Sequence, residues 1–134
     1  MIGTLVDSNV ILDLLTEDER WFGWSEGSLS AAAETGPLVI NPVIYSEVSV
    51  RFGSVEDLEA ALPSNDFLRA ALPWSAAFLA GKAFLDYRRR GGSRTSPLPD
   101  LFIGAHAAVG DLTLLTRDVT RYRTYFPTVR LMGP

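Results

Sequence analysis

The chain has 134 residues, 47% of them hydrophobic, and a formal net charge of −4. This length supports one sizeable core and is short for two, so we expect a single domain spanning residues 1–134. The negative charge argues against a protein that coats nucleic acid through overall cationic excess. The absence of cysteine excludes disulfides, thiolate zinc sites and cysteine nucleophiles.

Apolar runs and turn residues alternate along the chain. Short apolar runs predict strands at 4–6, 38–40, 113–116 and 129–131, the last of them at an edge. Apolar spacing and capping residues predict helices after Asp7, at 21–35, after Asn41 and Pro42, from Ser54 to about 62, from Ser75 to about 90, at 100–109 and at 119–125, with a loop at 93–99. Strands alternating with helices indicate an α/β fold with a mostly parallel sheet, helices on both faces and right-handed crossovers.

The apolar segments also bear on the compartment. Asp7 interrupts the first apolar run before it could serve as the core of a signal peptide. No apolar stretch reaches the length needed to span a bilayer. We therefore expect a cytoplasmic protein without membrane contact, which the absence of cysteine also fits.

Two aspartates stand at the ends of predicted strands. Asp7 follows the first strand, and Asp118 stands just beyond the 113–116 strand. In an open parallel sheet the carboxyl ends of the strands share one edge, where ligands bind, so both carboxylates are expected in one crevice. Asp100 begins the helix before the 113–116 strand, and Glu47 lies about two turns into the helix after 38–40. For these two acids the pattern alone does not decide whether they reach that edge.

Carboxylates gathered in a crevice need a proton or a cation, because desolvation and like charge both oppose ionisation. Oxygen ligands with no nearby Cys or His are the set that Mg²⁺ or Mn²⁺ prefers. Such an ion lowers the pKa of its bound water and neutralises charge that builds on a phosphoryl oxygen. The acids therefore indicate a divalent metal site suited to phosphate-ester hydrolysis.

Each acid also has an ordinary structural interpretation. Asp7 and Asp100 stand where turns and helix caps are common, and Glu47 lies on a helix that must turn one face to solvent. His106, the only histidine, lies among alanines and is expected to pack or to face solvent rather than to catalyse. Other acids are expected on solvated helix faces and at caps, including Asp13, Glu17, Asp18, Glu19, Glu34, Glu56, Asp57, Glu59 and Asp86.

Arginines form two clusters in this otherwise acidic chain. One comprises Arg88, Arg89, Arg90 and Arg94, and the other Arg117, Arg121 and Arg123. Such runs are either solvated helix ends or contacts to a nucleic-acid backbone or a protein partner. The aromatic residues are interpreted as core or interface rather than as base-stacking groups, namely Trp21, Trp24, Trp74, Tyr122, Tyr125 and Phe126.

Four short segments carry a resemblance to a known family. Asp7-Ser8-Asn9-Val10, Ser46-Glu47, Pro99-Asp100 with its Ala-rich helix, and Thr116-Arg117-Asp118 occur in the order seen in PIN domains. The length and the order of helices and strands are similar to those of VapC, the toxin half of a type II toxin–antitoxin pair. The match covers nearly the whole chain, which therefore resembles a PIN-domain ribonuclease of the VapC type.

The resemblance implies a role for each matching residue. Asp7, Glu47 and Asp100 match the principal metal-coordinating acids of the family, and Asp118 matches a more variable fourth acid that often acts through water. Thr116 matches a supporting hydroxyl. Asn9 matches a polar position that orients the first aspartate, although Asn there is equally an ordinary N-cap.

The activity implied by the resemblance is that of an endoribonuclease that hydrolyses RNA phosphodiester bonds with a water activated by Mg²⁺ or Mn²⁺. The implied partners are a VapB-like antitoxin and a second copy of the chain, giving a homodimer and, with antitoxin, a heterotetramer or larger assembly. Contacts to RNA or antitoxin then fall to Arg88, Arg89, Arg90, Arg94 and Arg117.

Other functions fit the residues less well. A phosphate-transfer domain of the haloacid-dehalogenase type needs a second aspartate two residues after the first, where this chain has Asn9. A receiver-like domain needs a lysine after a later strand, whereas the only lysine, Lys82, falls in a predicted helix. A PIN-like binding module that does not cleave RNA remains an alternative, because sequence does not display turnover.

Overall fold

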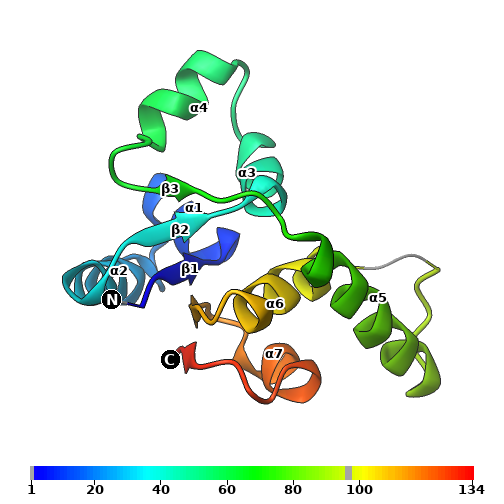
Figure 1. The fold of residues 1–134 in the computed structure, drawn as a ribbon. Coiled ribbons are helices and arrows are strands. Elements are labelled where there is room, and N and C mark those ends of the chain that lie inside the picture. Colours follow the sequence, from blue (N-terminus) through cyan, green and yellow to red (C-terminus); the bar gives the residue numbers. More distant parts are fainter. Residues whose placement is uncertain (1, 96–97) are drawn as a thin grey trace.

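The computed structural model describes residues 2–95 and 98–134. Its strands are β1 (Thr4–Val6), β2 (Leu38–Ile40), β3 (Leu68–Arg69), β4 (Thr113–Leu115) and β5 (Leu131–Met132). They form one sheet in the order β3-β2-β1-β4-β5, and every pairing is parallel (Figure 1). The predicted α/β class with a largely parallel sheet is confirmed.

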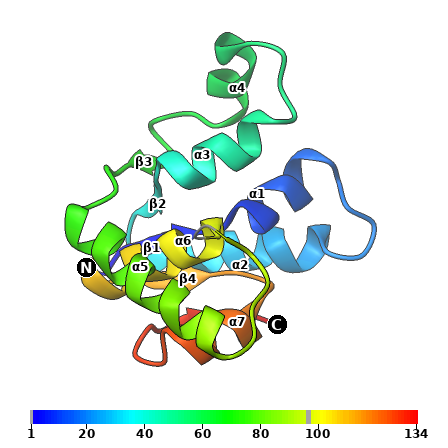
Figure 2. The same ribbon diagram turned by 90° about the vertical axis from the view of Figure 1, so that its right-hand side faces the viewer.

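Helices follow or precede each strand. Those in the described residues are α1 (Ser8–Leu15), α2 (Phe22–Thr35), α3 (Pro42–Ser49), α4 (Val55–Ala61), α5 (Trp74–Arg89), α6 (Pro99–Val109) and α7 (Val119–Tyr125). Helices α5 and α6 pack along each other on one side of the sheet, α1 and α2 lie on the other, and α4 stands away from the sheet (Figures 1 and 2). None of the described helices has the length and apolar character needed to cross a bilayer.

Local side-chain contacts explain several helix starts. The Asp7 carboxylate accepts a hydrogen bond from the Ser8 amide at the start of α1. The Asn41 side chain accepts from the Ile44 amide, and Pro42 occupies the first helical position of α3. Ser54 caps α4 by accepting from the Asp57 amide, as the sequence predicted.

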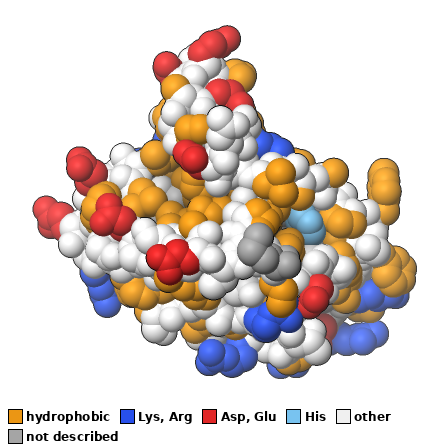
Figure 3. Space-filling model, turned by 60° about the vertical axis from the view of Figure 1, so that its left-hand side comes forward, with side chains coloured by type: hydrophobic (Ala, Val, Ile, Leu, Met, Phe, Trp, Pro, Cys, Tyr) orange, Lys and Arg blue, Asp and Glu red, His pale blue; other side chains and the backbone are white. Residues whose placement is uncertain are grey.

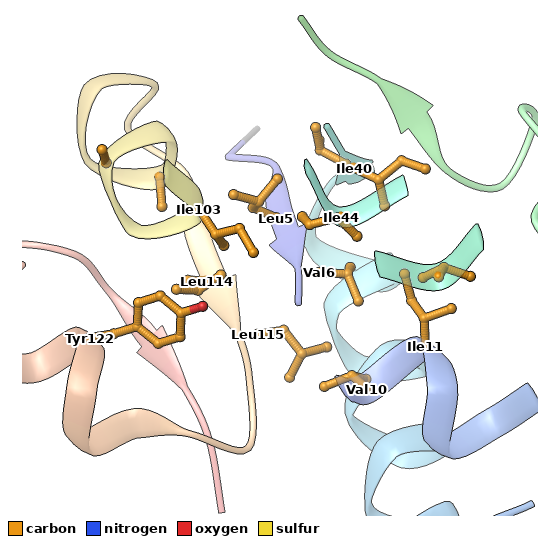
Figure 4. Packing of buried hydrophobic residues seen from close by; sticks show 14 of the residues in the cluster. Leu5, Val6, Val10, Ile11, Ile40, Ile44, Ile103, Leu114, Leu115 and Tyr122 are labelled. Carbon is orange, nitrogen blue, oxygen red and sulfur yellow. The ribbon is translucent and has the colours of Figure 1, made fainter. Parts of the chain in front are cut away.

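The core lies on both faces of the central strands. Leu5 of β1 and Leu114 of β4 are fully buried, in keeping with the continuous apolar runs of strands covered on both sides. Figure 4 shows these strands packed between Ile103 of α6 and Val10 and Ile11 of α1. This packing fixes the position of the strand ends from which the candidate site is built.

Four local predictions are corrected by the structure. Strand β3 was not predicted, because its two residues at the sheet edge carry no alternating pattern. Helix α5 begins at Trp74 after Pro73, so Ser75 does not cap it. The last strand is Leu131–Met132 rather than 129–131. Pro99 already belongs to α6, which shortens the predicted 93–99 loop, and residues 96 and 97 of that loop lie outside the described residues.

The chain reverses its winding direction beside the central strand. From β1 it proceeds to β2 and β3 on one side, and β4 and β5 add to the other side. Ligands of open parallel sheets bind where the direction reverses, outside the carboxyl ends of the strands. Here that place is the crevice beyond β1 and β4, where Asp7 and Thr116 are the next residues along the chain.

Candidate metal centre

Asp7 lies at the centre of this crevice and is only 3% exposed. Its amide donates to the Leu115 carbonyl, so the backbone of the residue is held at the end of the β1–β4 ladder. Its Oδ1 accepts from the Ser8 amide at 2.8 Å, and its Oδ2 accepts from the Thr116 hydroxyl at 2.8 Å. Asp7 therefore lies at the strand end, as predicted, and its carboxylate does more than cap α1, because its second oxygen is bonded to Thr116.

Asn9 and Thr116 both support this carboxylate. The Asn9 side-chain amide lies 3.4 Å from Asp7 Oδ2 and 3.4 Å from Thr116 Oγ1. Thr116 Oγ1 in turn accepts from the Asp118 amide at 3.0 Å. Asn9 Oδ1 accepts from the Arg117 amide at 3.3 Å, so these side chains tie the start of α1 to the turn after β4.

Glu47 reaches the same crevice from α3. Its Oε1 accepts a hydrogen bond from the Ser8 hydroxyl at 3.0 Å, and Ser8 is the residue whose amide binds Asp7. Glu47 is half-buried. Ser8 thus holds two of the predicted acids next to each other, a link that the spacing of the sequence did not predict.

Asp100 enters from the first turn of α6, where the partial positive charge of a helix N-terminus favours an acid. Its Oδ2 lies 3.2 Å from the guanidinium of Arg121, which comes from α7. Asp118 stands at the N-cap position of α7, exposed to solvent, and makes no side-chain capping bond. Asp118 therefore lies at the margin of the site.

The charges of the acids act on one another. Burial raises the pKa of Asp7, and repulsion from Asp100 adds to the rise. Burial likewise raises the pKa of Glu47, with repulsion from Asp7 and Asp100. Burial raises the pKa of Asp100, against the opposing effect of Arg121 and with repulsion from Asp118. Asp7, Glu47 and Asp100 thus share one electrostatic environment in which their ionisation is opposed.

Asp7, Glu47 and Asp100 offer carboxylate oxygens, the ligands that a hard divalent cation prefers. Their ionised forms carry more negative charge than the neighbouring cations compensate, which also favours binding of such an ion. Arg121 is the cation that faces Asp100. Among residues 2–95 and 98–134, however, no three acids or histidines converge closely enough to enclose an ion as they stand. Coordination of one ion by three of these acids would therefore need their side chains to move from these positions.

Tyr122 is a residue of this site that the sequence interpretation missed. It is fully buried, and its hydroxyl donates to Asp7 Oδ2 at 3.0 Å. Burial and the surrounding acids raise its pKa strongly, so the hydroxyl keeps its proton. Residue spacing offered no signal for this contact, because Tyr122 and Asp7 are 115 positions apart and meet only through the packing of α7.

Asp13 corrects a sequence prediction, since it is buried rather than solvated. Its Oδ2 accepts from the Ser25 hydroxyl at 2.7 Å and lies 2.9 Å from Arg117 Nε. The Arg117 guanidinium also lies 5.0 Å from the centre of the Trp21 ring. Arg117 therefore contacts residues of α1 and α2 inside the protein. These contacts make its guanidinium less available for the predicted contact to RNA or antitoxin.

The other predicted basic contacts lie together at the end of α5. Arg88, Arg89, Arg90 and Arg94 are exposed. Arg90 pairs with Asp86, and Arg88 donates to the Arg94 carbonyl. In Figure 3 several acidic side chains lie on the projecting part of the molecule and on the left of the face in view, and most of the visible Lys and Arg side chains lie along its lower edge. Basic groups thus gather locally on this face, although the net charge of the chain is negative.

His106 packs inside the protein, one of the two placements expected for it. It lies on α6, and its Nδ1 is 3.0 Å from the Asn41 side-chain nitrogen. Burial lowers the pKa of His106, so the neutral ring accepts the amide hydrogen at Nδ1. The contact connects α6 to the N-cap of α3, the helix that carries Glu47.

The sequence matches the family model of the PIN domain over residues 4–127. The chain therefore belongs to the PIN domain family, and the haloacid-dehalogenase and receiver alternatives are set aside. A comparison with curated proteins found no match.

Solved structures with the same fold include VapBC structures and a toxin–antitoxin complex from Klebsiella pneumoniae. VapBC2 of Rickettsia felis, bound to a promoter DNA fragment, matches with a TM-score of 0.75 and 15% identity, over 99% of each chain. VapBC-1 of nontypeable Haemophilus influenzae matches with a TM-score of 0.74 and 16% identity, over 98% of each chain. FitAcB of Neisseria gonorrhoeae matches with a TM-score of 0.63 and 18% identity, over 96% of each chain. At these identities the likeness establishes the shared fold.

Proposed function

We propose that this protein is a VapC-like toxin, a metal-dependent endoribonuclease whose PIN domain extends over residues 1–134. The observation that carries the proposal is the set of acids at the reversal point of the sheet, Asp7, Glu47 and Asp100, whose charges oppose one another in a partly buried crevice. In a member of the PIN family, such a set is best accounted for by a divalent cation.

Mg²⁺ or Mn²⁺, when bound, would supply Lewis acidity toward a phosphate oxygen and neutralise charge developing there. Asp7 would be the best-oriented ligand, because hydrogen bonds fix both of its oxygens. Glu47 and Asp100 would complete the set from α3 and α6, and Asp118 would contribute at the margin. Arg121, which pairs with Asp100, would meet a backbone phosphate that enters the crevice.

The shared fold supports the further proposal of an antitoxin partner, because the similar solved structures include VapBC structures and a toxin–antitoxin complex. We propose a VapB-like antitoxin and a homodimer of this chain, which together form a heterotetramer or larger assembly. The exposed basic groups at the end of α5, Arg88, Arg89, Arg90 and Arg94, are candidates for contacts to RNA or to an acidic antitoxin segment.

The test is cleavage of a total RNA pool by purified protein freed of any partner. Wild-type protein should cleave with Mg²⁺ or Mn²⁺ and stop with chelator, while Asp100→Asn should fold and lose cleavage. Asp86→Asn is the matched control, because Asp86 lies on α5 and pairs with Arg90 away from the acids. Wild type that binds metal and RNA without cleaving would favour the PIN-like binding module instead.

A further inference from the structure

Tyr122 is the one tyrosine whose hydroxyl enters the candidate metal centre in the described residues. Its ring leaves α7 and points into the core toward β4, with the hydroxyl leading (Figure 4). The side chain is 0% exposed, and its hydroxyl oxygen lies 3.0 Å from Asp7 Oδ2. A buried hydroxyl among apolar side chains needs a partner, and here the partner is a proposed metal ligand.

The hydrogen-bond direction at the neighbouring Thr116 is settled by its other contacts. A hydroxyl has one hydrogen to donate and two lone pairs to accept with. Thr116 Oγ1 accepts from the Asp118 amide at 3.0 Å and lies 3.4 Å from the Asn9 side-chain amide. Its single hydrogen is therefore free to point at Asp7 Oδ2, 2.8 Å away.

Asp7 Oδ2 thus has three donors: the hydroxyls of Thr116 and Tyr122 at 2.8 and 3.0 Å, and the Asn9 side-chain amide at 3.4 Å. The other oxygen, Oδ1, has one described donor, the Ser8 amide. One lone-pair position of Oδ1 remains for another ligand. The carboxylate is therefore held asymmetrically, because Oδ2 is bonded to three donors and Oδ1 to one.

We infer that Tyr122 is a positioning residue: its hydroxyl, bonded to Oδ2, holds the Asp7 carboxylate in the orientation from which it would bind a divalent cation. The inference rests on the proposed metal site and adds to it a residue that orients one of the proposed ligands. Groups that orient a metal ligand in this way commonly contribute about 10-fold to 100-fold in metal affinity.

The close approach of Tyr122 is built into the neighbouring helix. Gly104 of α6 faces the Tyr122 and Phe126 rings, and a Cβ at this position would lie 2.3 Å from Phe126 and 3.0 Å from Tyr122. Glycine at this position therefore lets the Phe126 and Tyr122 rings pack directly against α6. The same helix α6 carries Asp100 in its first turn.

The test compares Mn²⁺ binding by calorimetry in wild type, Tyr122→Phe and Tyr125→Phe, without any cleavage assay. Tyr122→Phe keeps the ring and removes only the hydroxyl. Tyr125→Phe is the control, because Tyr125 is on the same helix and packs by Tyr87, away from Asp7. We expect affinity to fall about tenfold in Tyr122→Phe and to change less than about twofold in Tyr125→Phe.

Equal Mn²⁺ affinity in folded wild type and Tyr122→Phe would overturn the inference and leave the proposed function standing. Absence of Mn²⁺ binding by folded wild type would overturn the proposed function itself. If Tyr122→Phe does not fold, NMR spectroscopy of the wild-type protein tests the inference about Tyr122 instead. A slowly exchanging Tyr122 hydroxyl proton whose resonance shifts on addition of Mg²⁺ supports the inference, and a rapidly exchanging one contradicts it.

Discussion

The hydroxyl of Thr116 donates to Oδ2 of Asp7 at 2.8 Å, across 109 positions of the sequence. This bond joins the ends of the two central strands, β1 and β4, at the point where the winding of the sheet reverses. It also connects two residues that the family resemblance marks for different roles, a metal-coordinating acid and a supporting hydroxyl. The stability of the strand ends and the orientation of the acid are therefore coupled.

Thr116→Val should destabilise the metal-free protein by about 1–3 kcal/mol, because it leaves the Asp118 amide and one side of Asp7 without their partner. Urea unfolding measures this change. Thr113→Val is the matched control, since Thr113 lies on the same strand β4 away from the acids. Equal stability of the two variants would show that the Thr116–Asp7 bond contributes nothing measurable.

The stability of the metal-free protein should fall as the pH rises. The folded-state pKa values of Asp7, Glu47 and Asp100 are raised, so the folded state holds these protons more tightly than the unfolded state. Their contribution is therefore present in full below the unfolded pKa of about 4 and is lost as the pH passes through the raised values.

Asp7→Asn removes one of these groups, so its stability should depend less steeply on pH than that of wild type above pH about 4. Unfolding by urea in the presence of chelator, at a series of pH values, measures both slopes. Added Mg²⁺ should reduce the loss in wild type more than in the variant. A wild-type slope that is equal to or shallower than the variant slope would contradict the assignment of a raised pKa to Asp7.

Arg121→Gln should tighten divalent-metal binding a few-fold, because it removes a cation that lies against Asp100 and competes with the ion. The expected effect is modest, since both side chains of the pair are partly exposed. Calorimetric titration with Mn²⁺ measures it. Arg123→Gln, an exposed position on the same helix, is the control, and weaker binding in Arg121→Gln than in this control would be the opposite of the expected result.

Arg117→Ala should act on stability more than on RNA. The substitution leaves buried Asp13 with the Ser25 hydroxyl but without its cation, which we expect to cost about 1–3 kcal/mol once the partial exposure of Arg117 is considered. Arg88→Ala, at the exposed end of α5, should leave stability within about 0.5 kcal/mol of wild type. Equal unfolding midpoints for the two variants would contradict a stabilising role of Arg117 and would favour the predicted contact of Arg117 to RNA or antitoxin.

The pattern and spacing of the residues predicted those parts of the fold that depend on contacts between neighbours in the sequence. The strands at 4–6 and 38–40 are short apolar runs bounded by turn residues, and both form as predicted. The N-cap Asn41 and the cap Ser54 likewise act through neighbours three residues away. Strand β3 was missed because pairing with β2, rather than its own two residues, makes it a strand.

The candidate site divides in the same way. The position of Asp7 follows from the strand before it, whereas the contact of Glu47 with Ser8 depends on how α3 packs against α1. Asp13 appeared as one more helix-surface acid, and only its pairing with Arg117, far along the chain, buries it. Tyr122 appeared as a core aromatic, which it is, but the partner of its hydroxyl could not be read from spacing.

Direct titration of Mn²⁺ into wild type, Asp7→Asn, Asp100→Asn and the control Asp86→Asn tests the central claim that Asp7 and Asp100 share a divalent cation. Wild type and Asp86→Asn should bind Mn²⁺ saturably and with equal affinity. Asp7→Asn and Asp100→Asn should remain folded and lose at least about tenfold in affinity. Folded wild type that binds no divalent ion, or folded Asp7→Asn and Asp100→Asn variants that bind it as tightly as wild type, would contradict the account.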